Sequence, residues 1–197
     1  MSHDAHFTHA HMVRFDWPLP ATPAEVWAVL TDVTRLPGWY GADGMLEGMI
    51  GGAVRLMGDH IRGTVTQWQP PRKLGYSWNV FGTNDETSPY PESYLTLELS
   101  PQDNGTMLAL THLPVLEPFV KVNAMGWHTY LDMVEAAVTG ATVEPREAYM
   151  KRNAQRYGVD LNNMPRYSDG GASSDLIRKC ALAVATGLAR SSCQASA

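Results

Sequence analysis

The stretch TVTQWQPPRKLGYSWNV, residues 64–80, decides the fold class because it predicts two strands joined by a tight turn. Apolar and polar residues alternate on both sides of its proline pair, which is the period of a strand with one buried face. The prolines end the first strand and set the turn to the second. The second strand sends Tyr76 and Trp78 to one face, whereas strict alternation from Val65 places Trp68 on the opposite, outward face.

Strand patterns continue on both sides of this stretch. Between residues 45 and 113 every segment is typical of a strand, a turn or a loop. A hairpin at Gly51 and Gly52 joins a strand near residues 45–50 to the next one, since glycine supplies the positive φ of a tight loop. The polar segment FGTNDETSPYPE, residues 81–92, interrupts the series as a loop suited to a rim or lid. We expect about six antiparallel strands in this part of the chain.

One strand and one helix precede this series. MVRFDWPL, residues 12–19, alternates apolar and polar side chains and predicts a first strand. In TPAEVWAVLTDV, Thr22 and Glu25 form a capping-box pattern with a proline at the first helical position, which predicts the start of a helix. The next segment, LPGWY, breaks this helix and predicts a short turn that carries Trp39 and Tyr40. The apolar stripe of the helix comprises Val26, Val29, Leu30 and Val33.

A long amphipathic helix is predicted in EPFVKVNAMGWHTYLDMVEAAVTG, residues 117–140. We expect it to begin near Pro118 and to end at Gly140, which gives a rod of about 30 Å. A meandering sheet and a helix with one apolar stripe each need a partner, so we expect an α+β fold in which they pack together. The stripe recurs at steps of four and three and comprises Val120, Ala124, Trp127, Leu131, Val134 and Val138.

Five of these segments, in this order, resemble the helix-grip START-like superfamily (SRPBCC). The chain is most similar to homologues of the C-terminal domain of the heat-shock chaperone ATPase activator. The resemblance implies a curved antiparallel sheet of about six or seven strands wrapped around the long C-terminal helix, with an apolar cavity between them in many members. It does not imply one activity, because the fold hosts several. The matching segments are TPAEVWAVLTD, LPGWY, MIGGAVRL, the run over residues 63–78, and GWHTYLDMV.

The chain divides into four parts by composition and pattern. We expect residues 1–10 to form a flexible, histidine-rich N-terminus and residues 11–140 to form the helix-grip domain. Residues 141–167 form a helical C-terminal extension, with Tyr149, Asn153 and Tyr157 on one side. We expect residues 168–197 to form a loosely attached tail, because a Gly/Ser-rich segment leads into it, and its pattern is compatible with one helix.

The predicted interior gathers the candidate ligand-binding residues. Inward-facing strand positions and the helix stripe together point eight side chains at the same space. His112 is the ionisable group among them, so it is either a polar anchor or acid–base group for a ligand, or a core histidine hydrogen-bonded to its neighbours. Packing alone also explains the aromatic residues, which leaves a solid core and a ligand-sized cavity both open. The eight are Trp39, Tyr76, Trp78, Leu97, Leu110, His112, Trp127 and Leu131.

Composition and charge exclude several classes of function. Residues 1–140 hold 15 acidic and 7 basic residues, and an acidic domain repels a phosphate backbone, so no nucleic-acid partner is expected. The longest small-apolar run, residues 180–189, is shorter than the roughly 18 residues of a membrane span. The first residues lack the pattern of a secretory signal, and we therefore expect a cytoplasmic protein.

No catalytic residue, metal ligand or cofactor is assigned. The histidines at positions 3, 6, 9 and 11 have spacings that could hold a metal, but a frayed terminus explains them as well. Asp132 and Glu135 lie off the apolar stripe and are expected on a solvated helix face. The sequence lacks the Walker loop and the Rossmann fingerprint of nucleotide-binding proteins. It also lacks the H-E-x-x-H zinc motif and the G-x-S-x-G nucleophile elbow.

Three functions remain compatible with the sequence. The first is binding of a small hydrophobic or amphipathic ligand between the sheet and the long helix. The second is a chaperone-associated module that contacts a chaperone or another protein. The third is a polyketide-cyclase-like enzyme that uses His112 as acid or base.

Overall fold

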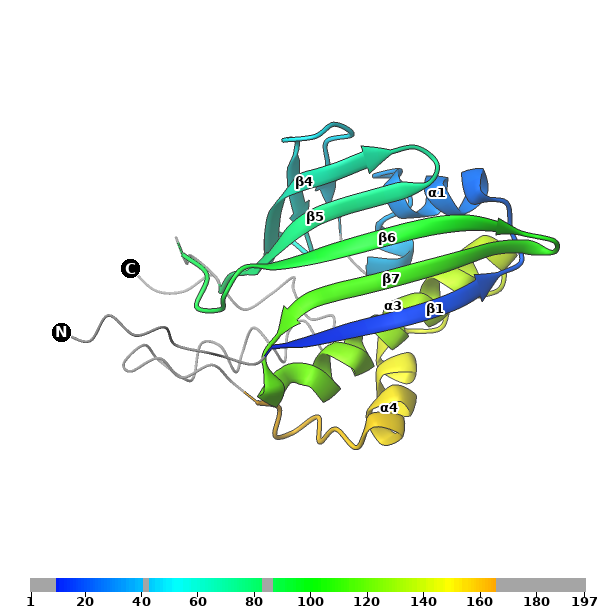
Figure 1. Ribbon diagram of the computed structural model, residues 1–197. Coiled ribbons are helices and arrows are strands. Elements are labelled where there is room, and N and C mark those ends of the chain that lie inside the picture. The colour runs from blue at the N-terminus through cyan, green and yellow to red at the C-terminus, as the bar shows by residue number, and fades with distance from the viewer. Residues whose placement is uncertain (1–9, 41–42, 83–86, 166–197) are drawn as a thin grey trace, which may run out of the picture.

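A computed structural model of the chain describes residues 10–40, 43–82 and 87–165 and shows an α+β helix-grip fold (Figure 1). Seven antiparallel strands form one sheet in the order β1-β7-β6-β5-β4-β3-β2. This arrangement confirms the predicted fold class and the meander. The strands are β1 (His11–Leu19), β2 (Met45–Leu46), β3 (Ala53–Leu56), β4 (Ile61–Gln69), β5 (Lys73–Val80), β6 (Ser93–Gln102) and β7 (Gly105–Val115).

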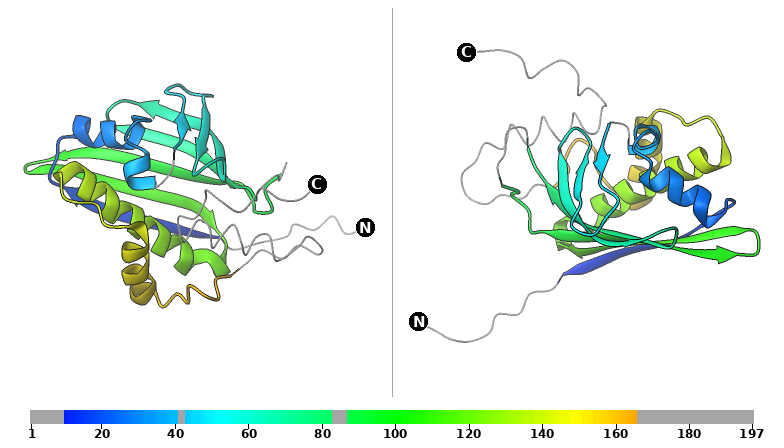
Figure 2. Two further views of the ribbon diagram at one scale, coloured as in Figure 1. Left: turned by 180° about the vertical axis from the view of Figure 1, so that it is seen from behind. Right: turned by 90° about the horizontal axis from the view of Figure 1, so that it is seen from above.

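The helices lie together against one face of the sheet, and the strands β2 to β4 curl up beside them (Figure 2). The long helix α3 runs along β1, β6 and β7, and α4 packs on the side of α3. The sheet therefore wraps around α3, as the resemblance implied. The helices are α1 (Pro23–Thr31), α2 (Pro37–Tyr40), the 3-10 turn η1 (Glu117–Phe119), α3 (Val120–Thr139) and α4 (Arg146–Tyr157).

Local signals in the sequence explain where these helices begin and end. The Thr22 side chain accepts a hydrogen bond from the Glu25 backbone, and the Glu25 carboxylate accepts one from the Thr22 backbone, so the predicted capping box is present. Gly140 adopts the left-handed conformation at the end of α3, and Gly158 does so at the end of α4. The predicted helix in the C-terminal extension is therefore present, while the proposed division into domains stays a prediction.

Two predicted segments are shorter in the structure. The strand expected near residues 45–50 is paired only over Met45–Leu46, because the chain turns before the glycine pair and Gly51 has a φ of 83°. The first helix ends at Thr31, so Val33 falls beyond it and is exposed. The tail at residues 168–197 and the first nine residues lie outside the described residues.

The outward placement predicted for Trp68 is wrong. The register of β4 against β5 shifts between Val65 and Gln67, so that one extra residue interrupts the alternation. Trp68 then lies opposite the buried Leu74 and packs edge-on against Trp27, with ring centroids 5.0 Å apart. The β-bulge therefore places Trp68 on the core side of the sheet.

The two edge strands of the sheet differ in length. β1 forms one edge, and an ion pair between Arg14 and Asp16 (2.7 Å) and the exposed Pro18 lie along it. β2 forms the other edge and pairs with β3 over two residues. The core lies between these edges, where β5, β6 and β7 face α3.

Candidate functional site

Five of the eight predicted binding residues surround a small cavity between the sheet and α3. Its volume is about 10 Å³, which is near the minimum needed for one water molecule. A ligand larger than a water molecule therefore requires side chains to move at this place. The lining residues are Trp39, Leu97, Leu110, Trp127 and Leu131 from the predicted set, together with Leu30, Leu108, Tyr130 and Val134.

The other three predicted residues, Tyr76, Trp78 and His112, lie beside this cavity without lining it. Tyr76 is buried, and its hydroxyl is 2.7 Å from that of Tyr40. Burial raises the pKa of Tyr76 and of Tyr40 above the usual tyrosine value, so both hydroxyls stay protonated. This pair is a neutral hydrogen bond inside the core.

His112 joins the sheet to the long helix through hydrogen bonds on both ring nitrogens. The Trp127 indole N–H donates to Nδ1 over 2.8 Å, and Asn123 Nδ2 lies 2.9 Å from the same atom. Nε2 is 2.8 Å from the Ser93 hydroxyl, and that hydroxyl donates to the backbone oxygen of Trp78. Strand alternation therefore predicted the inward position of His112 correctly, and its partners are those of a satisfied core histidine.

The partners of His112 determine its tautomer and its charge. Because Nδ1 accepts from Trp127, the proton of the neutral ring is on Nε2, which donates to Ser93. Burial lowers the pKa of His112 to about 4, and its hydrogen bond with Asn123 opposes this shift to a smaller extent. His112 is therefore neutral at physiological pH, with neither nitrogen available to a substrate.

Trp78 connects this interior to the surface. Its ring is half-buried and lies 5.0 Å from the Trp127 ring and 5.7 Å from the His112 ring, between centroids. Trp127 in turn lines the small cavity. The aromatic side chains thus form a continuous wall from the solvent-accessible edge of Trp78 to the cavity.

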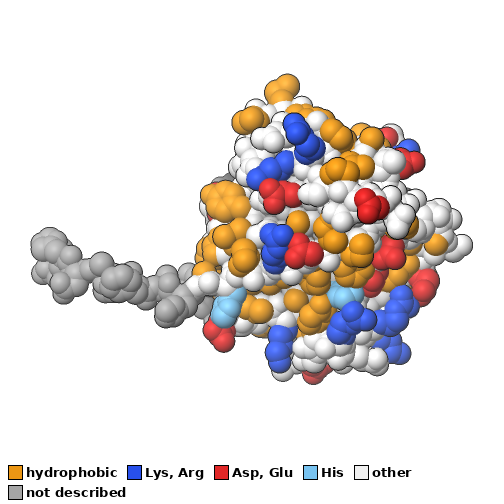
Figure 3. Space-filling view, turned by 45° about the vertical axis from the view of Figure 1, so that its right-hand side comes forward, with side chains coloured by type: hydrophobic (Ala, Val, Ile, Leu, Met, Phe, Trp, Pro, Cys, Tyr) orange, Lys and Arg blue, Asp and Glu red, His pale blue; other side chains and the backbone are white. Residues whose placement is uncertain are grey.

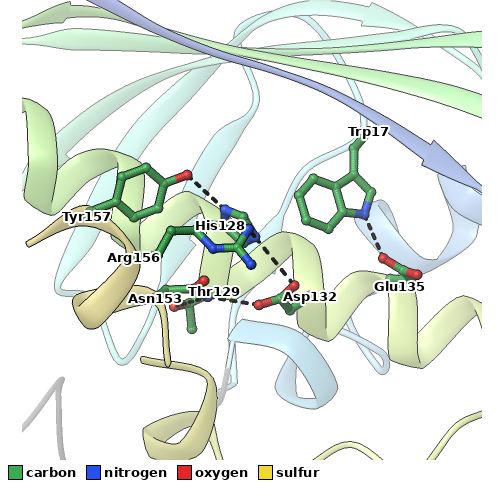
Figure 4. A network of polar contacts seen from close by, with 8 residues as sticks. All are labelled: Trp17, His128, Thr129, Asp132, Glu135, Asn153, Arg156 and Tyr157. Carbon is green, nitrogen blue, oxygen red and sulfur yellow. Dashed lines mark hydrogen bonds and ion pairs between the residues drawn. The ribbon is translucent and has the colours of Figure 1, made fainter. Parts of the chain in front are cut away.

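A second polar network ties α3 to α4, and the sequence did not predict it (Figure 4). Arg156 donates to Nε2 of the buried His128 over 3.0 Å, so Nδ1 carries the proton and donates to the Tyr157 hydroxyl. Asn153 Nδ2 donates to Asp132 over 2.8 Å, and Asp132 is 3.8 Å from His128 Nε2. Burial lowers the pKa of His128, although the nearby Asp132 opposes this effect.

The expectation that Asp132 and Glu135 lie on a solvated face is wrong. Both are partly buried, because β1 and α4 cover the side of α3 that the apolar stripe leaves free. The Trp17 indole N–H donates to Glu135 over 2.9 Å (Figure 4). The i, i+4 spacing of His128 and Asp132 was the signal available in the sequence, but only tertiary contacts show that α4 covers them.

Charged and apolar side chains share the described surface. Figure 3 shows acidic and basic side chains interspersed with hydrophobic ones over the face that it presents. Met49 and Ile50, in the loop between β2 and β3, are exposed. Within residues 10–40, 43–82 and 87–165, no cluster of three or more potential metal ligands is present. None of the helices in this part of the chain is long and apolar enough to cross a membrane.

Solved structures with this fold include proteins from Micromonospora echinospora, Bordetella parapertussis and Plasmodium falciparum. CalU16 from Micromonospora echinospora, in its crystal structure, is 25% identical with a TM-score of 0.58, over 75% of this chain and 84% of that chain. The protein encoded by gene BPP1335 from Bordetella parapertussis is 21% identical with a TM-score of 0.61, over 87% and 95%. PFC0360w, an HSP90 activator from Plasmodium falciparum, is 21% identical with a TM-score of 0.56, over 66% and 97%.

The family of the chain follows from a sequence match that covers most of the helix-grip domain. No curated protein matches the chain. The model of the family described as "Activator of Hsp90 ATPase homolog 1-like protein" matches residues 20–139, which run from the start of α1 to the end of α3. With the helix-grip fold and these structural neighbours, the chain belongs to the family of Activator of Hsp90 ATPase homolog 1-like proteins.

Proposed function

We propose that the protein binds a small apolar or amphipathic molecule between the sheet and α3. The observation that carries this proposal is the aromatic wall that leads from the half-buried Trp78 through Trp127 to the cavity. A ligand that displaces the Trp78 ring reaches a cavity lined by leucine, valine, tryptophan and tyrosine side chains. Burial of ligand surface there contributes about 25 cal/mol per Å² and offsets the displacement of the ring.

Mass spectrometry of the protein, purified under mild conditions from its own cells, tests this proposal. We expect a reproducible additional mass under native conditions that is absent under denaturing conditions. Trp127→Ala and Trp78→Ala should both reduce its occupancy, because each removes part of the wall. Trp78→Ala is the safer variant, since truncating the buried Trp127 costs about 3–5 kcal/mol of folding free energy.

Lys73→Ala is the matched control. Lys73 forms an ion pair with Glu98 over 2.7 Å and takes no part in the aromatic wall, so this variant should retain the additional mass. Equal occupancy in all three variants would contradict the assignment of the site. An apo mass, together with no calorimetric binding of naphthalene-sized apolar compounds, would contradict the function itself.

A chaperone-associated role is the second candidate. The description of the matched family and the nearly filled interior both favour it over an enzyme. We expect a purified Hsp90 to hydrolyse ATP faster when the protein is added at equimolar concentration. Ile50→Ser, at a side chain that is 70% exposed, should weaken the effect if the β2–β3 loop is the contact. An unchanged ATPase rate would exclude this role. Under both candidate functions, we propose that the protein is located in the cytoplasm.

The cyclase-like enzyme has the least support from the site. His112, its acid–base candidate, has both nitrogens in hydrogen bonds within the protein and a pKa of about 4. A general acid or base works best with a pKa near the working pH and with a free position toward the substrate. We therefore assign no catalytic role to His112.

A further inference from the structure

Beside the path that leads past Trp78, one buried polar atom has no hydrogen-bond partner. This atom is Oδ1 of Asn123, in the first turn of α3. Buried carbonyl oxygens in native proteins are nearly always paired, because burial removes the water that would otherwise donate to them. An unpaired acceptor oxygen at a proposed ligand site indicates that the ligand supplies a hydrogen-bond donor.

The amide of Asn123 cannot turn to find a partner within the protein. Nδ1 of His112 accepts from the Trp127 indole, so it presents a lone pair and not a proton. Asn123 must then direct Nδ2 toward Nδ1, as its 2.9 Å separation shows. Rotation of the amide would bring Oδ1 against that lone pair, and two acceptors would face each other. The orientation of Oδ1 is thus fixed by the tautomer of His112.

The neighbouring polar groups are already engaged. The Trp127 N–H donates to His112, the N–H of His112 donates to Ser93, and the Ser93 hydroxyl donates to the backbone of Trp78. The acceptor left over in this group is Oδ1 of Asn123, and the second N–H of the same amide is the one donor that these contacts do not engage. Trp127 lies four residues after Asn123 on the same face of α3, so the oxygen lies next to the aromatic wall.

We propose that Asn123 is the polar anchor of the ligand site, and that the ligand carries a hydroxyl or N–H group that donates to Oδ1. This inference rests on the proposed ligand-binding function and narrows the class of ligand. A carboxylate fits poorly, because its negative charge would face the unpaired amide oxygen, which is also an acceptor, beside a neutral histidine. The site therefore selects apolar molecules with one hydrogen-bond donor, such as alcohols and phenols.

Calorimetric titration with 1-naphthol and 1-methylnaphthalene tests the anchor. The two compounds have nearly the same shape, and they differ in whether a hydroxyl or a methyl group is attached to the ring. We expect wild-type protein to bind 1-naphthol roughly 10-fold more tightly, which is the effect of one well-placed hydrogen bond. We expect 1-naphthoate to bind more weakly than either.

Asn123→Ala should remove the preference and leave the two compounds with equal affinity. The variant keeps the hydrogen bond from Trp127 to His112 and removes the unpaired oxygen, so it should fold, and thermal unfolding checks this. Asn153→Ala is the matched control, because Asn153 is a buried asparagine of α4 that donates to Thr129 and Asp132 and is remote from His112. This control should keep the 10-fold preference.

The possible failures are distinguishable. Equal binding of the two compounds by wild-type protein overturns the donor requirement and leaves the ligand-binding function standing. A preference that survives Asn123→Ala overturns the assignment to Asn123. Binding of neither compound by wild-type protein overturns this inference together with the proposed function.

Discussion

At His112, hydrogen bonds on both sides of the ring replace the water that burial removes. Trp127 donates to one nitrogen and Ser93 accepts from the other, so the neutral ring is fully satisfied. A protonated ring would carry a proton on Nδ1, where it would meet the Trp127 donor. The interior therefore tolerates a histidine only in its neutral form.

Stability should consequently fall as the solution becomes acidic. The pKa of His112 is about 4 in the folded protein and about 6.5 in the absence of such burial. Between pH 4 and pH 6.5 the unfolded chain therefore binds more protons than the folded protein does. The contribution of His112 to the free energy of unfolding is complete above pH 6.5 and is lost as the pH falls toward 4. The loss amounts to roughly 3 kcal/mol for this residue. Urea unfolding across this pH range measures it.

His112→Gln isolates this contribution. Glutamine can accept from Trp127 and donate to Ser93 but does not titrate, so the pH dependence should become shallower. Some dependence should remain, because burial also lowers the pKa of His60 and of His128. The same slope in the variant and in wild-type protein would show that His112 does not govern acid stability.

Single residues show both the strength and the limit of sequence patterns. The alternation in β7 predicted that His112 points inward, because that strand is regular. The same rule failed for Trp68, since the register shift after Val65 changes which face the following residues occupy. The apolar-stripe rule for helices failed for Asp132, because no local pattern shows that Asn153 from another helix will donate to it.

Among the elements, β4 and α3 each contain a glycine, and the two glycines have opposite surroundings. A Cβ added at Gly63 would collide with the backbone oxygen of Ser77 on β5. A Cβ added at Gly126, in the middle of α3, would meet no atom within 4 Å. Glycine is therefore required for close strand pairing at the first site and only weakens the helix at the second.

Alanine at these two sites should have opposite effects on stability. Gly126→Ala should raise the free energy of unfolding by about 0.5–1 kcal/mol, because alanine loses less backbone entropy in a helix. Gly63→Ala should lower it by roughly 1–3 kcal/mol, because β4 and β5 must separate to admit the methyl group. Denaturant titration of both variants checks the pair, and stabilisation by Gly63→Ala would contradict the close approach.

The ends of elements were predictable where a side chain or a glycine marks them. The capping box at Thr22 and the glycine at the end of α3 are local, so short sequence patterns identified both. The strand near residues 45–50 was predicted too long, because its pairing with β3 ends where the chain turns, and pairing is not a local property.

At the scale of the whole molecule, the sheet and α3 were predictable as partners, but the contents of the space between them were not. The order of elements and the apolar faces determine which surfaces pack together. The cavity of about 10 Å³ depends instead on how individual side chains fill that space, for example Trp39 and Leu131. Eight residues could therefore be assigned to the interior while its capacity for a ligand could not be predicted.

The helix α4 lies beyond the part of the chain that the family model matches. It nevertheless buries Tyr149 and Asn153 and contributes Arg156 to the contacts of His128. Helix α4 thus covers a side of α3 that would otherwise face solvent. A ligand that enters between the sheet and α3 must therefore approach from another side of α3.

The two edge strands of the sheet affect whether copies of the protein associate at high concentration. An open strand edge can recruit a strand from a second copy and begin a growing assembly. Along β1 a new strand would have to accommodate the charged pair of Arg14 and Asp16 and the missing N–H of Pro18, and along β2 it would find two paired residues. We therefore expect the charged pair on β1 and the shortness of β2 to disfavour edge-to-edge association of two copies.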